Sequence, residues 1–263
     1  MLAGQGRLDT GCWGDHLELV TEVPLQVFND EEARRLLGAR GVTDPDVIEV
    51  ILQLTGRLPV LVDLLAQTRP HHTSQIGDPS DTAVERFLKW ETDPSRRTAA
   101  QLCALPLQLD EDLFHALISD VTIDEYAWLR GLPFVTGQAG RCRYHDVVRT
   151  PMLRLQRTQS PAHWQHHHTR LADIYQQRRH ALESTLPDDR RWGDTAWLEH
   201  QLNESYHRLC ADPHQALPDV LQQAIHACDR GADVLRRWSQ VLTQAGTDTD
   251  APFLTTWPGP PRP

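Results

Sequence analysis

The stretch from Gly131 to Arg149 constrains the fold of this chain more than any other. It opens with the aromatic and β-branched run Phe134–Thr136, and two glycines, Gly137 and Gly140, then bracket a short turn. An extended alternation resumes after the turn, and apolar side chains recur at helical spacing from Val148 onward. This pattern predicts a tight β-hairpin that leads directly into an amphipathic helix.

His145 and Asp146 lie where the predicted second strand gives way to this helix. An aspartate at such a junction can cap the helix N-terminus, which leaves the imidazole of His145 able to face a binding partner. His145 is therefore the first candidate site residue, and Asp146 is the predicted helix cap at the site. The structural alternative is that His145 only satisfies a hydrogen bond at the end of the strand.

Helical periodicity governs the rest of the chain, and capping residues place the first helices. Asn29 or Asp30 can cap a helix over residues 31–39, Asp44 can cap a second helix, and a third, more apolar helix is predicted over residues 58–67. Three short helices cannot enclose a core alone. Residues 25–75 are therefore predicted to form a helical lid that leans on a neighbour.

Four more short helices are predicted between this lid and the hairpin, because acidic residues or prolines begin each periodic segment. They span residues 81–90, 94–105, 110–119 and 124–132. Short helices followed by a hairpin are typical of a winged-helix domain. We therefore expect such a domain over residues 76–160, with the hairpin as its small β element.

Beyond residue 160 the pattern is entirely helical, and aromatic and leucine side chains recur at core spacing. Four longer helices are predicted, over residues 161–182, 192–210, 213–228 and 233–245. We expect residues 161–246 to form an antiparallel, TPR-like helical segment without a clean repeat period. The tail over residues 247–263 is rich in Thr, Asp and Pro and is expected to be disordered. The predicted fold class is mainly α.

The charge balance restricts the classes of partner. The formal net charge is −10, which argues against nonspecific affinity for nucleic acid or for an anionic membrane surface. No run approaches the roughly 18 apolar residues of a membrane span, and the N-terminal residues lack the layout of a signal peptide. We therefore expect a cytoplasmic protein. The five cysteines include no CxxC pair, so neither a disulfide framework nor a zinc site is predicted.

A winged-helix transcription regulator with a helical effector domain is the alternative function. The segment that would enter a DNA groove carries Asp124 and Glu125 against only Arg130, which is the wrong balance for DNA. Arg141 and Arg143 do make the hairpin locally basic. DNA is thus an unfavoured partner, and a purely helical interaction scaffold is a third hypothesis.

A histidine-rich segment suggests a metal site, since His163 and His167 share one helical face. The segment also contains His166 and His168. No acidic or cysteine residue lies in register with them, so we expect a solvated helical face and no metal. No Gly-x-Ser-x-Gly elbow identifies a nucleophile, so no catalytic residue is predicted.

Three separated motifs resemble those of the STAND-type regulatory P-loop NTPases, signalling relatives of the AAA+ ATPases that include the NB-ARC proteins. Val23–Leu25 followed by Asp30–Leu37 resembles the entry to the family's first helical lid. Gly56–Leu61 resembles the Gly-Leu-Pro-Leu motif, and Tyr144–Asp146 resembles the Met-His-Asp motif with Tyr in place of Met. The resemblance covers about residues 2–175, which are the lid, winged-helix and first helical regions.

The resemblance implies a nucleotide-binding role for Arg7, Gly56, Pro59 and His145. Pro59 would pack near the nucleotide base, and His145 would approach the β-phosphate of bound ADP and hold a closed, resting state. Arg7 would correspond to the arginine that senses the γ-phosphate, and residues 1–24 to the remnant end of the nucleotide-binding α/β domain. The implied cofactor is ADP or ATP, with Mg only in the complete parent protein.

The sequence contains neither a Gly-Lys-Ser/Thr loop nor an acidic magnesium-binding strand, both of which the family carries upstream of these motifs. We therefore expect this chain alone to be no enzyme and to bind no nucleotide tightly, while its parent protein is an ATPase. The expected partners are a missing or separate P-loop domain, a protein bound by the C-terminal helices, and further copies of the chain on activation. We expect the upstream reading frame to encode the loop within about 150 residues.

Overall fold

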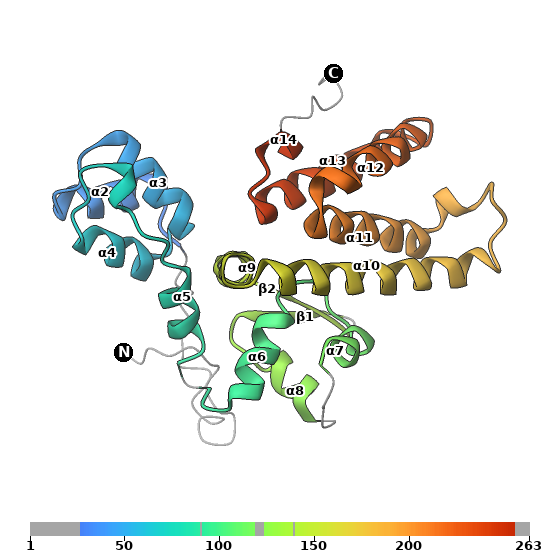
Figure 1. Cartoon of the computed structure of the whole chain (residues 1–263), viewed down its shortest axis with the longest axis horizontal. Helices are drawn as coiled ribbons and strands as arrows, with labels where there is room; N and C mark the ends of the chain where they lie inside the picture. The colour runs from blue at the N-terminus through green and yellow to red at the C-terminus, as the bar shows by residue number, and fades with distance from the viewer. Residues whose placement is uncertain (1–26, 90, 119–123, 139, 256–263) are drawn as a thin grey trace, which may run out of the picture. The chain divides into compact units, whose positions relative to one another are not determined.

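The computed structural model describes residues 27–89, 91–118, 124–138 and 140–255 (Figure 1). Within these ranges it contains thirteen α-helices and one antiparallel sheet of two strands, which confirms the predicted mainly α fold class. The chain divides into two compact units, which are described separately. They are Met1–Trp90 with Thr122–Pro151, and Glu91–Val121 with Met152–Pro263. The predicted remnant over residues 1–24 lies outside the described residues.

The first unit begins with a small bundle of three helices, α2 (Asp30–Ala39), α3 (Pro45–Thr55) and α4 (Pro59–Gln67). The Glu32 N–H donates a hydrogen bond to Asn29 Oδ1, and the Asn29 N–H donates one to Glu32 Oε2. This reciprocal pair fixes the start of α2. Asp44 accepts hydrogen bonds from two backbone N–H groups at the start of α3, which confirms that predicted cap. Of the two cap candidates for α2, Asn29 and Asp30, Asn29 is the cap.

These three helices enclose a core of their own, so the prediction that they need a neighbour was wrong. The buried side chains of this core are Ala33, Leu37, Val42, Val47, Ile48, Ile51, Leu52, Val62, Leu65 and Ala66. Phe28 precedes the bundle, Ile76 follows it, and both pack against the core. The prediction counted the helices alone and left out the flanking segments that close the bundle.

The rest of the first unit carries the predicted hairpin. Its elements are η2 (Thr73–Gln75), α5 (Ser80–Phe87), α8 (Asp124–Arg130), β1 (Val135–Gln138), β2 (Arg141–Tyr144) and the start of α9 (Asp146–Gln159). The strands are antiparallel, with Val135 opposite Tyr144. Gly140 has a φ of +79°, which favours glycine, and its carbonyl accepts a hydrogen bond from Tyr126 Oη at 3.1 Å. The turn is therefore anchored to α8.

The second unit is built around a pair of long helices, α10 (Pro161–Glu183) and α11 (Thr195–Ala211), which lie side by side (Figure 1). Its other elements are α6 (Pro94–Leu102), α7 (Glu111–Leu117), the remainder of α9, η3 (Arg191–Gly193), α12 (Pro213–Cys228), α13 (Ala232–Thr249) and α14 (Pro252–Thr255). Trp197 and Tyr206 are buried as predicted, at 5% and 0% exposed, and Trp164 and Tyr175, at 6% and 4%, also lie in the core. Trp192, predicted to begin α11, lies instead in η3.

The predicted disorder from residue 247 is wrong for residues 247–255, which form the end of α13 and the short helix α14. Leu254 is 1% exposed, and a Cβ at Gly246 would lie 2.7 Å from Thr255 Cγ2, so the two helices are in close contact. Tyr206 Oη donates a hydrogen bond to Asp248 Oδ2 at 2.6 Å. The polar composition predicted disorder because it gave no weight to these few buried contacts.

Tyr206→Phe should lower the free energy of unfolding by about 1.5–3 kcal/mol, because Asp248 is only 5% exposed and loses a hydrogen bond to its charged group. The measurement is the urea midpoint. Tyr175→Phe is the matched control, since Tyr175 is also buried, at 4% exposed, but its hydroxyl lies 3.5 Å from the Gln108 carbonyl, and we expect a smaller loss there. Equal midpoints for both variants would show that the Asp248 contact does not hold this end of the chain.

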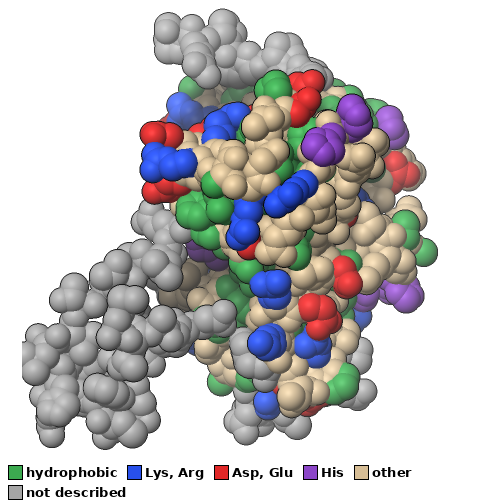
Figure 2. All heavy atoms as spheres, turned by 90° about the vertical axis from the view of Figure 1, so that its left-hand side faces the viewer, with side chains coloured by type: hydrophobic (Ala, Val, Ile, Leu, Met, Phe, Trp, Pro, Cys, Tyr) green, Lys and Arg blue, Asp and Glu red, His purple; other side chains and the backbone are tan. Residues whose placement is uncertain are grey.

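The described surface is charged and mixed in sign. On the face shown in Figure 2, basic and acidic side chains are interspersed. Exposed ion pairs among the described residues include Arg34 with Glu49 and Arg35 with Glu31. Among the residues that the structure describes, no helix combines the length and the apolar composition needed to span a bilayer.

Candidate functional site

The Gly56–Pro59 segment forms a tight turn between α3 and α4. Gly56 ends α3 in the left-handed conformation, with φ of +54°. Pro59 is the first residue of α4, where the missing N–H removes no helical hydrogen bond. Pro59 thus has the position of an ordinary first-turn proline, and its half-buried ring leaves part of its surface accessible.

Two contacts join this turn to the start of α2. The Phe28 N–H donates a hydrogen bond to the Arg57 carbonyl at 3.0 Å. The Arg57 guanidinium forms an ion pair with Asp30, whose backbone begins α2. The motif segment therefore has a structural role within the three-helix bundle, whatever else it contacts.

His145 occupies the cap position of α9, because the helix begins at Asp146. The His145 carbonyl accepts hydrogen bonds from the Val148 and Arg149 N–H groups, and its Nδ1 lies 3.4 Å from the Val147 nitrogen. The prediction of Asp146 as the cap was therefore wrong by one residue. Asp146 lies in the first turn, where a carboxylate still interacts favourably with the helix dipole.

The geometry around His145 leaves one ring nitrogen available. Its backbone N–H donates to the Phe134 carbonyl at 2.8 Å, which joins the junction to the first strand. The Val147 N–H···Nδ1 contact is long, at 3.4 Å, and Nε2 makes no hydrogen bond with the described residues. The side chain is exposed on a backbone held at a fixed position, so its ring is accessible to a binding partner.

The nucleotide-binding residues inferred from the sequence are not joined to one another in the described residues. No hydrogen bond or ion pair connects the Gly56–Pro59 turn to His145 there. Arg7, the fourth residue of the set, lies outside the described residues. Their shared role in binding a nucleotide therefore stays a prediction.

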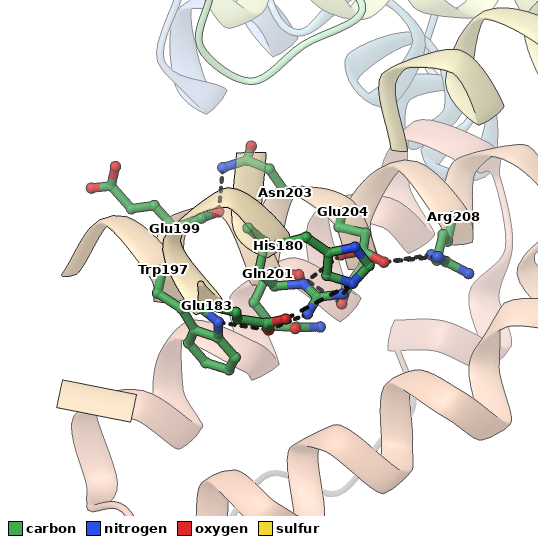
Figure 3. A network of polar contacts seen from close by, with 10 residues as sticks. His180, Glu183, Trp197, Glu199, Gln201, Asn203, Glu204 and Arg208 are labelled. Carbon is green, nitrogen blue, oxygen red and sulfur yellow. Dashed lines mark hydrogen bonds and ion pairs between the residues drawn. The ribbon is translucent and has the colours of Figure 1, made fainter. Parts of the chain in front are cut away.

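A buried polar network that the sequence analysis missed lies between α10 and α11 (Figure 3). Arg179 Nε donates a hydrogen bond to Glu204 Oε2 at 2.9 Å, and Arg179 Nη1 donates to Glu183 Oε1. Arg208 Nε donates to the other oxygen of Glu204 at 3.0 Å, and Trp197 Nε1 donates to Glu183 Oε1 at 2.9 Å. One guanidinium thus bridges two carboxylates.

Because the network is buried, its stability depends on each charged side chain having a partner of opposite charge. The side chain of Arg179 is 13% exposed and that of Glu204 is 5% exposed. Burial alone would lower the pKa of Arg179, but the hydrogen bonds to Glu204 and Glu183 outweigh it and raise that pKa. Burial alone would raise the pKa of Glu183, yet the hydrogen bonds from Trp197 and Arg179 lower it. Ionised Glu183 therefore stabilises the fold above its usual pKa, and this contribution is lost as the pH falls through the lowered value.

The network borders a pocket of about 580 Å³ within the second unit. Its walls come from α10, η3, α11 and α12. Besides the network residues, the wall includes Asp188, Arg191, Trp192, Gln201, Ser205, Asp219, Gln222, Gln223 and His226. Most of the lining residues are therefore polar, and the indole rings of Trp192 and Trp197 add apolar surface.

The sequence did contain a signal for this site. Arg179 precedes Glu183 by four residues, and Glu204 precedes Arg208 by four, so each pair shares a helical face. Such pairs are usually solvated, and only the packing of α10 on α11 buries them here.

The histidine segment of α10 does not form a metal site in the part of the chain that the structure describes. The predicted solvated face is wrong for His168, which is fully buried, with Nδ1 2.9 Å from Nδ1 of His207 on α11. His168 also packs 4.2 Å, centroid to centroid, from the Trp164 ring. It is therefore a core residue of the α10–α11 pair.

Comparison with known proteins adds no constraint. No family model, no curated protein and no solved structure matches the chain. Functional argument therefore depends on the sequence motifs and on the two sites described above.

Proposed function

We propose that this chain is the regulatory, signal-transducing part of a STAND-type ATPase. In this proposal the bundle α2–α4 is the lid, and the hairpin with α9 belongs to the winged helix. Both close over ADP or ATP that a P-loop domain outside this sequence binds, and helices α10–α14 couple the nucleotide state to a sensor or interaction partner. Catalysis belongs to the complete parent protein.

The observation that supports this proposal best is the state of His145. Its backbone is fixed by hydrogen bonds to Phe134 on one side and to the first turn of α9 on the other. Its side chain is exposed, and Nε2 makes no hydrogen bond with the described residues. An exposed imidazole on a fixed backbone at a strand–helix junction is suited to hydrogen bond a phosphate oxygen when the domain folds back on a nucleotide.

The Gly56–Pro59 turn supports the same proposal less strongly. It holds the accessible proline ring at a fixed place beside the start of α2, through the Arg57 contacts. An apolar ring at such a place can pack against a nucleobase in the closed state.

Calorimetry with ADP, on this chain alone and on the chain joined to its P-loop domain, tests the proposal. The isolated chain should bind weakly or not at all, because the backbone donors and lysine of a phosphate loop supply most of the recognition. The joined protein should bind with a micromolar or lower Kd. Micromolar binding by the isolated chain would contradict the proposal, since about 8 kcal/mol would then come from lid and winged-helix residues alone. An upstream reading frame without a Gly-Lys-Ser/Thr loop would also contradict it.

A further inference from the structure

We infer that the pocket formed by α10, η3, α11 and α12 receives a basic side chain, arginine or lysine, of a protein partner. This inference deepens the proposed function, in which the C-terminal helices bind a partner, and rests on it for the source of the ligand. The chemistry of the pocket itself involves no nucleotide. It can therefore be tested separately.

The arginines of the pocket are already paired with its carboxylates. Arg179 bridges Glu183 and Glu204, and Arg208 Nη2 lies 2.8 Å from Glu204 Oε1. At the pocket edge, Arg191 Nη2 lies 2.6 Å from Asp188 Oδ1. Each of these three guanidinium groups therefore has a carboxylate partner, although Arg191 Nε is buried without a hydrogen bond to the described residues.

Acceptors remain after this pairing. Asp219 lines the pocket from α12, is exposed, and forms no ion pair with any residue that the structure describes. Glu183 Oε1 takes both of the strong hydrogen bonds, whereas Oε2 has only His180 Nε2 at 3.9 Å, beyond hydrogen-bond distance. The pocket therefore offers carboxylate oxygens to a ligand with donors.

Gln201 adds a polar group to the pocket wall. It lines the pocket, is only 8% exposed, and its carboxamide makes no hydrogen bond with the described residues. Its amide atoms are not among the side-chain atoms that are buried without a hydrogen bond, so they are open to the pocket, where a ligand can bond them. The amide oxygen would accept from the same donor group that Glu183 and Asp219 attract.

The indole rings complete a site for a cation. Trp192 and Trp197 lie edge to face with centroids 5.3 Å apart, and both line the pocket. The Arg230 guanidinium already lies 5.9 Å from the Trp192 ring centroid, so this ring takes part in a cation–π contact. A guanidinium or ammonium in the pocket would find aromatic faces beside carboxylates.

Size and overall charge favour a side chain presented by a protein over a small free cation. A volume of about 580 Å³ exceeds what one guanidinium or ammonium group fills, so neighbouring residues of the ligand would occupy the rest. The net charge of −10 also favours the approach of a basic segment. Free arginine amide and spermidine carry the same cationic groups without a peptide around them, so they serve as controls for the contribution of the peptide.

The test is fluorescence anisotropy with the full chain, without nucleotide, and labelled pools of short peptides that have Arg, Lys, Gln or Glu fixed at the centre. The Arg or Lys pool should bind at least about tenfold more tightly than the Gln and Glu pools. One additional contact between charged groups accounts for a difference of this size in Kd. Asp219→Asn and Gln201→Leu should each weaken this binding several-fold. Asp233→Asn, at an exposed carboxylate outside the pocket lining, should leave it unchanged.

Three outcomes of the peptide experiment would overturn the inference. Equal binding of all four pools, or binding that both pocket variants leave intact, would show that the pocket does not select a cation. Free arginine amide or spermidine binding as tightly as the peptides would overturn the assignment to a protein partner. If the chain binds the basic peptides but the chain joined to its P-loop domain does not bind ADP, only the proposed nucleotide function is contradicted.

Discussion

Arg179→Met should lower the free energy of unfolding by about 3 kcal/mol, the largest stability effect that we expect from a single polar residue. Removing one partner of a buried ion pair typically costs about 3–5 kcal/mol, because the other charge stays buried without compensation. Here the loss falls at the lower end of that range, since Arg208 still hydrogen bonds Glu204 and Trp197 still hydrogen bonds Glu183. Chemical denaturation followed by circular dichroism measures the change.

Arg236→Met is the matched control for this prediction. Arg236 also pairs with a carboxylate, Asp233, but the two side chains are 67% and 90% exposed. Exposed pairs contribute only about 0–1 kcal/mol, so this variant should unfold close to the wild-type midpoint. An Arg179→Met variant no less stable than Arg236→Met would show that the α10–α11 network is not a buried structural element.

The elements that the sequence predicted correctly are those with local signals. The hairpin follows from the aromatic and β-branched run at Phe134–Thr136 and from Gly140, whose left-handed backbone permits the turn. The starts of α2 and α3 follow from Asn29 and Asp44, which bond backbone groups within three residues. Each of these signals lies inside the element that it specifies.

The features that the sequence did not predict depend on contacts between distant segments. Arg179 and Glu204 are far apart in the chain, and only the alignment of α10 against α11 joins them and excludes water. The same alignment buries His168 against His207, although its neighbours suggested a solvated face. The order of the last residues depends likewise on Tyr206 reaching Asp248. The spacing of residues within one helix shows which side chains share a face, but not which other helix packs against that face.

The start of α9 lies one residue from the predicted position, and this shift changes the contacts of His145. The sequence placed the cap at Asp146 and left the imidazole without backbone contacts, whereas in the structure His145 itself is the cap residue. The capping contact involves Nδ1 and leaves Nε2 without a hydrogen bond to the described residues, which the sequence could not show. Because His145 is the cap, a substitution of Asp146 does not remove the helix cap, and the two residues can be tested separately.

His145→Ala should release ADP about 10- to 150-fold faster from the chain joined to its P-loop domain. In the proposed function, a contact from His145 to the β-phosphate would exist only when the winged helix is closed, so it would bias the closed state by its own free energy. A charge-assisted hydrogen bond contributes about 1.5–3 kcal/mol, and about 1.4 kcal/mol corresponds to tenfold. The opened protein should also oligomerise or signal without its stimulus.

The most direct measurement of the proposed function is the ADP dissociation rate of the joined protein with His145→Ala, beside Asp146→Ala and with melting temperatures for both. Asp146→Ala removes only a first-turn carboxylate, worth about 0.3–1 kcal/mol of stability, and should leave the dissociation rate near that of the wild type. The account predicts fast ADP release in His145→Ala with the fold retained. An unchanged dissociation rate in a folded His145→Ala variant would contradict it and would leave this residue as the cap of α9 alone.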